Sequence, residues 1–177
     1  MDFYFSDDVI SSFVSHGWQV QLRNGQVDAE DHISKAINLI DKMPLAYKNF
    51  LNKYKLLVGP GEKSWFLMLE DYMEVSDSSF AWNEFEIQSM DAALDDSDRS
   101  QVQSFWSNHL PIFISLKNGY SYLAARINDH DKWSVVYGYE PEYENAETLF
   151  PSLDIFFESL ADHVSGKSIN SILNILI

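Results

Sequence analysis

The segment Pro111-Ile112-Phe113-Ile114-Ser115-Leu116-Lys117-Asn118-Gly119-Tyr120-Ser121-Tyr122-Leu123-Ala124-Ala125-Arg126-Ile127 carries the clearest structural signal of the sequence. Two apolar runs flank Asn118-Gly119, a dipeptide that readily adopts the positive φ angles of a two-residue type I′ turn, so the segment predicts a β-hairpin. A two-residue loop would pair Lys117 with Tyr120. This register would place on one buried face the side chains of Ile112, Ile114, Leu116, Leu123, Ala125 and Ile127.

Two further strands are predicted around this hairpin. Residues 133–139 (Trp-Ser-Val-Val-Tyr-Gly-Tyr) follow it after a short polar stretch and extend it into a three-stranded meander. Residues 64–69 (Ser-Trp-Phe-Leu-Met-Leu) are apolar on both faces, as expected of a central strand that is covered on both sides. The hairpin therefore belongs to a larger antiparallel sheet.

Helical periodicity occupies most of the remaining chain. A helix is expected from Asp28, as N-cap, through Ile40, and a second one follows Pro44. Further helices are predicted over 80–94, 97–106 and 152–164, the last ended by Gly166, and shorter helices over 9–14 and 169–176, with a strand at 18–22. The class is α+β: an antiparallel sheet with helices packed mainly on one face, in a single domain spanning 1–177.

Composition and charge exclude several classes of protein. The 177 residues contain no cysteine, which excludes disulfides and thiolate metal sites, and no apolar run approaches the roughly 18 residues that span a bilayer. We therefore expect a cytoplasmic protein without membrane contact. The formal net charge of -15 would repel nucleic-acid phosphates and would attract a basic partner.

The acidity is concentrated in one stretch. Between Glu70 and Asp98 there are ten Asp or Glu residues and no Lys or Arg. Aromatic residues interrupt these acids, a combination that is typical of an interface with aromatic anchors inside a polar rim, although such aromatics also serve as core residues. The predicted partner-binding residues are Glu70, Asp71, Tyr72, Glu74, Asp77, Trp82 and Glu84.

Motifs for catalysis or for metal and cofactor binding are not found in the sequence. Nucleotide-binding glycine patterns, Gly-x-Ser-x-Gly and His-Glu-x-x-His are absent, and the five histidines show no helical i, i+4 pair. Three acidic groups are interpreted as structural or solvated features and not as sites. Asp95-Asp96-Ser97-Asp98 is expected to cap a helix, Asp129-His130-Asp131 to lie in a loop, and the alternating Glu140, Glu142 and Glu144 to form a solvated strand end. We therefore predict no catalytic residue, metal or cofactor.

The chain resembles the SUKH superfamily, a set of α+β domains that includes bacterial immunity proteins and fungal cell-wall-synthesis regulators. The resemblance rests on Met43-Pro44-Leu45-Ala46-Tyr47-Lys48-Asn49-Phe50-Leu51 and on Phe105-Trp106-Ser107-Asn108-His109-Leu110-Pro111-Ile112, followed by the strands 120–127 and 133–139 and the helix 152–164. It covers residues 28–166. Residues 1–27 form an N-terminal extension to it and residues 167–177 a C-terminal tail.

The resemblance implies non-enzymatic binding that neutralises a toxin, frequently a nuclease, by occlusion. Nucleases that grip phosphates are basic, so an acidic inhibitor would complement one electrostatically. The expected function is thus that of an immunity-type protein with a basic toxin, of nuclease type, as its partner. Two alternatives stay open: a regulatory or scaffolding module that binds an endogenous protein, and a metal hydrolase built on converging carboxylates.

Overall fold

A computed structural model describes residues 5–25, 34–73, 80–127 and 133–177. In these segments helices and the strands of one antiparallel sheet form an α+β fold, which confirms the predicted class. The elements are α1 (Asp7–Ser15), β1 (Gln19–Leu22), α2 (Lys35–Asp41), α3 (Leu45–Lys53), β2 (Tyr54–Val58), η1 (Pro60–Glu62), β3 (Ser64–Phe66), α4 (Leu69–Tyr72), α5 (Glu84–Ala92), α6 (Asp96–Trp106), β4 (His109–Ser115), β5 (Ser121–Ile127), β6 (Trp133–Tyr139), β7 (Glu147–Phe150), α7 (Leu153–Val164) and α8 (Ser171–Leu176).

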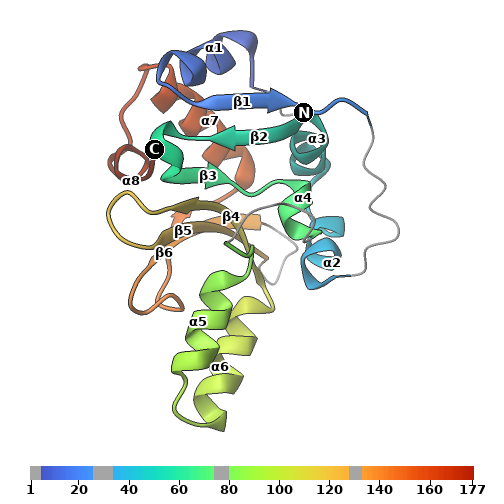
Figure 1. The fold of residues 1–177 in the computed structure, drawn as a ribbon, viewed down its shortest axis with the longest axis vertical. Helices are drawn as coiled ribbons and strands as arrows, with labels where there is room; N and C mark the ends of the chain where they lie inside the picture. The colour runs from blue at the N-terminus through green and yellow to red at the C-terminus, as the bar shows by residue number, and fades with distance from the viewer. Residues whose placement is uncertain (1–4, 26–33, 74–79, 128–132) are drawn as a thin grey trace.

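The strands follow one another in sequence order across the sheet, from β1 at one edge to β7 at the other. Every neighbouring pair is antiparallel. Figure 1 shows the sheet at the centre, with α1 beside its β1 edge and α5 and α6 extending away from it as a separate pair. No helix in the described residues is long and apolar enough to cross a membrane.

One face of the sheet is covered by helices α1, α3 and α7 through packed aromatic rings. Phe50 on α3 contacts Phe157 on α7, with ring centroids 5.1 Å apart, and Phe66 on β3, at 5.8 Å. Phe66 in turn packs against Phe113 of β4 at 4.8 Å. Phe66 meets Phe50 and Phe113 edge to face, which contributes beyond the buried area, and these rings belong to the hydrophobic core of the molecule.

Helices α5 and α6 pack on the other side of the central strands. Tyr122 of β5 is fully buried between Trp106 of α6 and Phe85 of α5, at centroid distances of 5.2 and 5.3 Å. Its hydroxyl donates a 2.6 Å hydrogen bond to the carbonyl of Tyr143. The N-terminal end of α5 and the C-terminal end of α6 are therefore packed on the sheet, while their other ends extend beyond it.

The predicted hairpin register is wrong by one residue. Ser115 pairs with Ser121 and Ile114 with Tyr122, so the loop is longer than two residues, although Gly119 has the expected positive φ of 96°. Distant contacts hold the loop open: the Leu116 N–H donates to Lys63, 2.6 Å away, and Lys117 Nζ donates to the Ile177 carbonyl at 2.6 Å. Both faces of β4 are buried, so alternation along the strand could not specify which face turned inward.

Other sequence predictions differ from the structure in their bounds. The helix expected from Asp28 begins instead at Lys35, because Ser34 has extended backbone angles and caps it; Asp28 itself lies outside the described residues. Strands β2 and β7 were not predicted. Glu140 and Glu142 lie in a turn after β6, and Glu144 accepts a hydrogen bond from Trp106 Nε1, so these three glutamates do not form an extended row.

The strand predicted over 64–69 ends at Phe66, and Leu69 begins α4; the helix predicted over 80–94 is shorter, Glu84–Ala92. The predictions for α6 and α7 agree closely with the structure. Helix α7 is capped by Ser152, whose side chain accepts from the Ile155 N–H, and the chain turns away at Gly166, with a φ of 71°. Helix α6 begins after Asp95, whose side chain accepts from the Asp98 N–H at 2.9 Å. The Asp95 to Asp98 run is thus a helix N-cap, as predicted.

Candidate functional site

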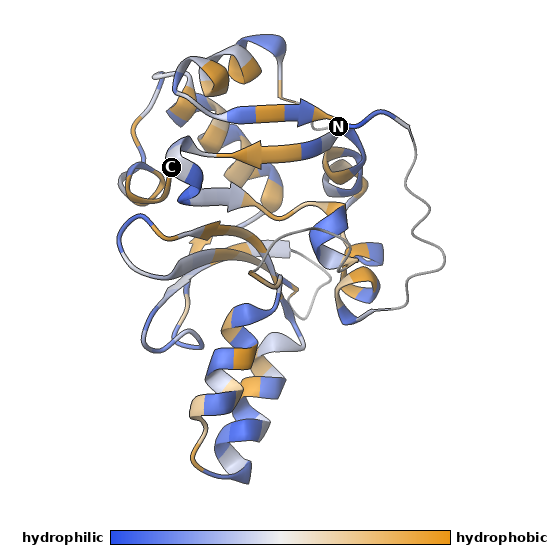
Figure 2. Cartoon of the chain, in the orientation of Figure 1, coloured by the Kyte–Doolittle hydropathy of each residue, from blue (hydrophilic) through white to orange (hydrophobic). Residues whose placement is uncertain are grey.

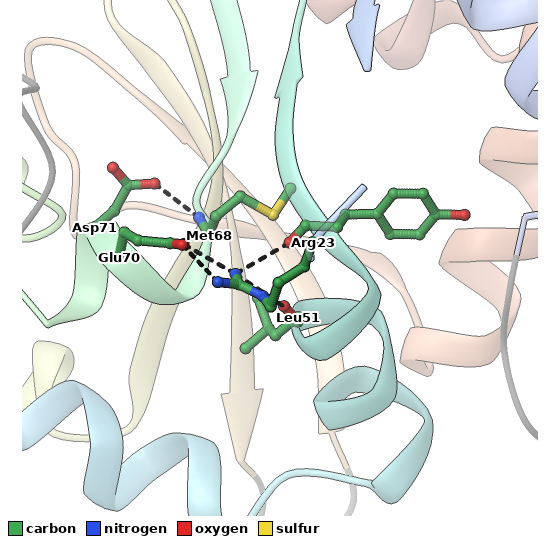
Figure 3. Close-up of polar contacts among 6 residues, drawn as sticks. Arg23, Leu51, Met68, Glu70 and Asp71 are labelled. Atoms are coloured by element: carbon green, nitrogen blue, oxygen red, sulfur yellow. Dashed lines mark hydrogen bonds and ion pairs between the residues drawn. The ribbon is translucent and has the colours of Figure 1, made fainter. Parts of the chain in front are cut away.

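Glu70 and Asp71 serve the fold at the start of α4. Arg23, which follows β1, donates from Nη2 to Glu70 Oε2 at 2.9 Å and to the carbonyls of Leu51 and Tyr54, each at 3.2 Å (Figure 3). Asp71 accepts a 2.7 Å hydrogen bond from the Met68 N–H and so closes the first turn of α4. Both carboxylates therefore have partners inside the molecule.

The electrostatics of Glu70 follow from this geometry. Its side chain is 22% exposed and that of Arg23 only 4%. Burial by itself raises the pKa of Glu70, but the hydrogen bond and the charge of Arg23 hold that pKa below its usual range. Glu70 is therefore ionised at neutral pH and already paired, which leaves it little attraction for a partner protein.

Tyr72 lies in the core. It is fully buried, its hydroxyl donates to the Pro111 carbonyl at 2.7 Å, and the Tyr47 hydroxyl lies 3.1 Å away. Burial raises the pKa of Tyr72 well above its ordinary value, so the phenol stays neutral. The predicted role of Tyr72 as an exposed anchor is therefore wrong, because its ring is covered on all sides by the fold.

The other predicted partner-binding residues divide into two groups. Glu74 and Asp77 lie outside the described residues. Trp82 is almost completely buried and packs 6.2 Å from the ring of Tyr72, whereas Glu84 is half-buried at the first turn of α5 and accepts a hydrogen bond from Gln88 at 3.1 Å. Of the predicted set, Glu84 thus marks where the acidic surface begins.

The acidic surface lies on the projecting pair α5 and α6, which we call the arm. From Glu84 to Asp98 the arm carries six acids and no base. Figure 2 shows that hydrophilic residues predominate over its outer part, away from the apolar strands. The acids in this stretch are Glu84, Glu86, Asp91, Asp95, Asp96 and Asp98.

Leu94 stands at the tip of the arm among these acids. It is 92% exposed, in the turn between α5 and α6. Its N–H donates to Asp98 Oδ2 at 3.2 Å, while the Asp98 N–H donates to Asp95 Oδ1, so side-chain caps hold the turn. An apolar side chain is therefore presented to solvent from a hydrogen-bonded turn.

A groove of about 460 Å³ lies at the base of the arm, between the start of α2 and the outer face of α5. Its wall includes Trp82, Ile87, Met90 and Asp91, together with the ion pair between Lys35 and Glu86. Lys35 Nζ is 2.7 Å from Glu86 Oε1. The pair neutralises one carboxylate and leaves Asp91 as the free charge of the groove.

Titratable groups elsewhere show no converging arrangement. Within the described residues no group of three or more His, Asp or Glu side chains could hold a metal ion. His109 is buried, donates from Nδ1 to the Phe105 carbonyl and stacks on the Phe105 ring at 3.8 Å. Burial lowers the pKa of His109 to about 4, so the ring is neutral at pH 7. Asp129, His130 and Asp131 lie outside the described residues.

Comparisons with protein-family models, with curated proteins and with solved structures find no match for this chain.

Sequence reasoning missed two features of this region. Arg23 is a single base after a short strand, and nothing in its local sequence shows that Glu70 lies beside it. Leu94 carried a weak signal, since it directly precedes Asp95, the N-cap of α6, and therefore lies in the connection between two helices.

The ten-acid stretch is visible in the sequence, but its described members differ in their surroundings. Glu70 and Asp71 have partners at α4, four of the six acids of the arm also accept hydrogen bonds, and Asp91 and Asp96 have no hydrogen bond recorded among the described residues.

Proposed function

We propose that this protein is a non-enzymatic, immunity-type binding protein that neutralises a basic toxin, of nuclease type, by docking its acidic arm on the toxin. The observation that carries the proposal is the charge of the arm from Glu84 to Asp98, which contains six acids, no base and a solvent-exposed tip; the single base of the arm, Arg99, follows this stretch on α6. The resemblance to SUKH immunity proteins supports the choice of a toxin as the partner.

The arm suits this role for an electrostatic reason. A surface that grips nucleic-acid phosphates is rich in Lys and Arg, and it attracts a carboxylate surface of matching extent. Such attraction acts mainly on the association rate and is screened over about 10 Å at 0.1 M salt. An arm that projects from the sheet can enter a phosphate-binding cleft and block it without any chemistry of its own.

Charge reversal on the arm tests the proposal. Asp91 and Asp96 accept no hydrogen bond that the described structure records, so reversing both to lysine changes the surface with little effect on the fold. The tagged full chain is used to capture its partner from the source cells at low salt, and the captured protein is identified and assayed for nuclease activity. We expect the wild type to inhibit that activity and Asp91→Lys/Asp96→Lys to associate at least about tenfold more slowly.

A matched control distinguishes docking by the arm from a general effect of the net charge of the protein. Asp154→Lys/Glu158→Lys on α7 changes the charge equally and likewise includes one acid in the first turn of a helix. This variant should retain nearly the wild-type association rate. Equal effects of the two reversals would contradict docking by the arm, and capture of an endogenous regulatory protein instead of a toxin would replace neutralisation by the regulatory alternative.

A further inference from the structure

The outer face of α5 carries an apolar stripe that no other described element covers fully. Ile87 and Met90 are spaced i and i+3, which places them on one side of α5. Leu94 follows two residues beyond the end of the helix at Ala92, after the extended C-cap Ala93. Ile87 is 41% exposed, and Met90 is half-buried at the groove. The opposite side of α5 is already used, because Phe85 packs 4.6 Å from the ring of Tyr143.

The groove and the tip of the arm both combine apolar side chains with carboxylates. The groove at the base of the arm is lined by Trp82, Ile87 and Met90, and Leu94 lies at the tip, four residues after Met90. Asp91 lies within the groove wall, and Asp95 and Asp96 are exposed beside Leu94. Apolar side chains and exposed carboxylates are therefore presented together by α5 and by the turn that joins it to α6.

The turn at the tip is held by hydrogen bonds within the protein itself. The hydrogen bonds of Leu94 and Asp98 to side-chain carboxylates fix the turn, although the Leu94 side chain itself contacts little of the protein. Ordering an anchor in advance lowers the entropy lost on binding. A leucine held this way is suited to enter an apolar pocket on another protein.

We infer that the groove and the apolar residues Ile87, Met90 and Leu94 form the docking surface for a basic, amphipathic helical segment of the partner, in which apolar side chains share one face and Lys or Arg flank them. This inference rests on the proposed function and adds the chemistry of the recognised segment. The apolar side chains pack against these apolar residues, and the cationic groups meet Asp91 and the acids at the tip.

Electrostatics favour a basic segment over other possible binding partners of this surface. A second copy of the chain would bring its own acids against those of the arm, and an anionic membrane surface would be repelled for the same reason. A purely hydrophilic cation would leave the groove and Leu94 uncovered. The segment must therefore combine positive charge with apolar side chains.

Two synthetic peptides test the inference with the full-length protein. The first contains lysines and leucines, with the leucines on one helical face; the second has the same lysines and a serine in place of each leucine. Affinity is measured by calorimetry and the contact surface by amide chemical-shift mapping. We expect the leucine peptide to bind at least about tenfold more tightly and to shift the amides of Ile87, Met90 and Leu94.

Matched variants locate the binding surface. Ile87→Ser/Leu94→Ser should reduce the affinity of the leucine peptide to that of the serine peptide. Ile155→Ser/Ile169→Ser is the control, since these isoleucines are 43% and 85% exposed elsewhere, and it should bind as the wild type does. If both peptides bind with equal affinity and lose it only on Asp91→Lys/Asp96→Lys, the inference that the apolar residues take part in docking is overturned. The proposed docking by the acidic arm would then still stand. Shifts confined to other elements would also overturn the inference.

Discussion

At the scale of single residues, Arg23 shows how one buried charge connects three parts of the chain. Its guanidinium donates to Glu70 at the start of α4 and to the carbonyls of Leu51 and Tyr54 where α3 meets β2. The two carbonyls lie at the end of α3, where the helix supplies no further N–H donor. The Arg23 guanidinium supplies the donor instead. The pair therefore stabilises the junction between helix and sheet, and not an interface.

The first prediction concerns this ion pair. Glu70→Gln should lower the free energy of unfolding at pH 7 by about 3 kcal/mol, because it leaves the buried Arg23 without its counter-charge. Arg23→Gln should lower it by about 2 kcal/mol, because Glu70 is partly exposed but the Leu51 and Tyr54 carbonyls lose their donor. The control Glu158→Gln, on the exposed face of α7, should change it by less than about 0.5 kcal/mol. Urea denaturation of the three variants measures these values.

The pH dependence of the same variants gives an independent check. The folded-state pKa of Glu70 lies below its unfolded value of 4.5, so its stabilisation is complete above pH 4.5 and disappears as the pH falls through the lower folded pKa. The difference between wild type and Glu70→Gln should therefore shrink in acid. A difference that stays constant down to pH 3 would contradict the role assigned to the pair.

At the scale of secondary-structure elements, the fit between β5 and β6 depends on one position without a side chain. Gly138 pairs with Tyr122 across the two strands, and a Cβ atom at Gly138 would lie 2.4 Å from Tyr122 Cζ. The buried Tyr122 ring passes over this glycine to reach the carbonyl of Tyr143. A close approach of this kind is a regular use of glycine within a strand.

The second prediction follows from that contact. Gly138→Ala should lower the free energy of unfolding by about 2–3 kcal/mol, because the Tyr122 ring must shift from its packed position. Tyr122→Leu in the same chain should relieve the clash, so the double variant should lose less stability than the two single losses added together. Thermal and urea unfolding of the four proteins measures the coupling, and strict additivity would show that the two positions do not interact.

At the scale of the whole molecule, the sheet and the arm differ in how they are supported. Strands β4, β5 and β6 have a neighbour on both sides and are largely buried, whereas β1 is an exposed edge and the outer arm has little buried surface. The described contacts of the arm with the sheet are concentrated at its root, around Phe85 and Trp106. Local opening should therefore begin away from the central strands.

The third prediction concerns this difference in local stability. In hydrogen exchange at neutral pH, the amides of β5 should exchange only on global unfolding, and those of β1 and of residues 92–95 should exchange much sooner. Mass spectrometry of peptic fragments, or amide NMR, measures the order. Protection at the tip equal to that of β5 would show that the arm unfolds together with the sheet and is not an independently opening element.

Several features of this protein were determined by the sequence itself. Helices α6 and α7 could be predicted together with their caps, Asp95 and Ser152, because capping depends on hydrogen bonds between residues three positions apart. The antiparallel meander of β4, β5 and β6 could be predicted from short apolar runs separated by a turn signal. The ten acids without a base are a property of composition, so the acidic region needed no structure to be found.

Only the tertiary structure decided which of these residues are buried, paired or exposed. The hairpin register depends on Lys63 and on the end of α8, and the exposure of Leu94 depends on α5 and α6 extending beyond the sheet. Glu70 and Tyr72 left the candidate surface because Arg23 and Tyr47, at least 25 residues away in the chain, lie beside them. Capping and turn formation depend on neighbours in sequence, whereas burial and charge pairing depend on neighbours in space, which a local pattern does not contain.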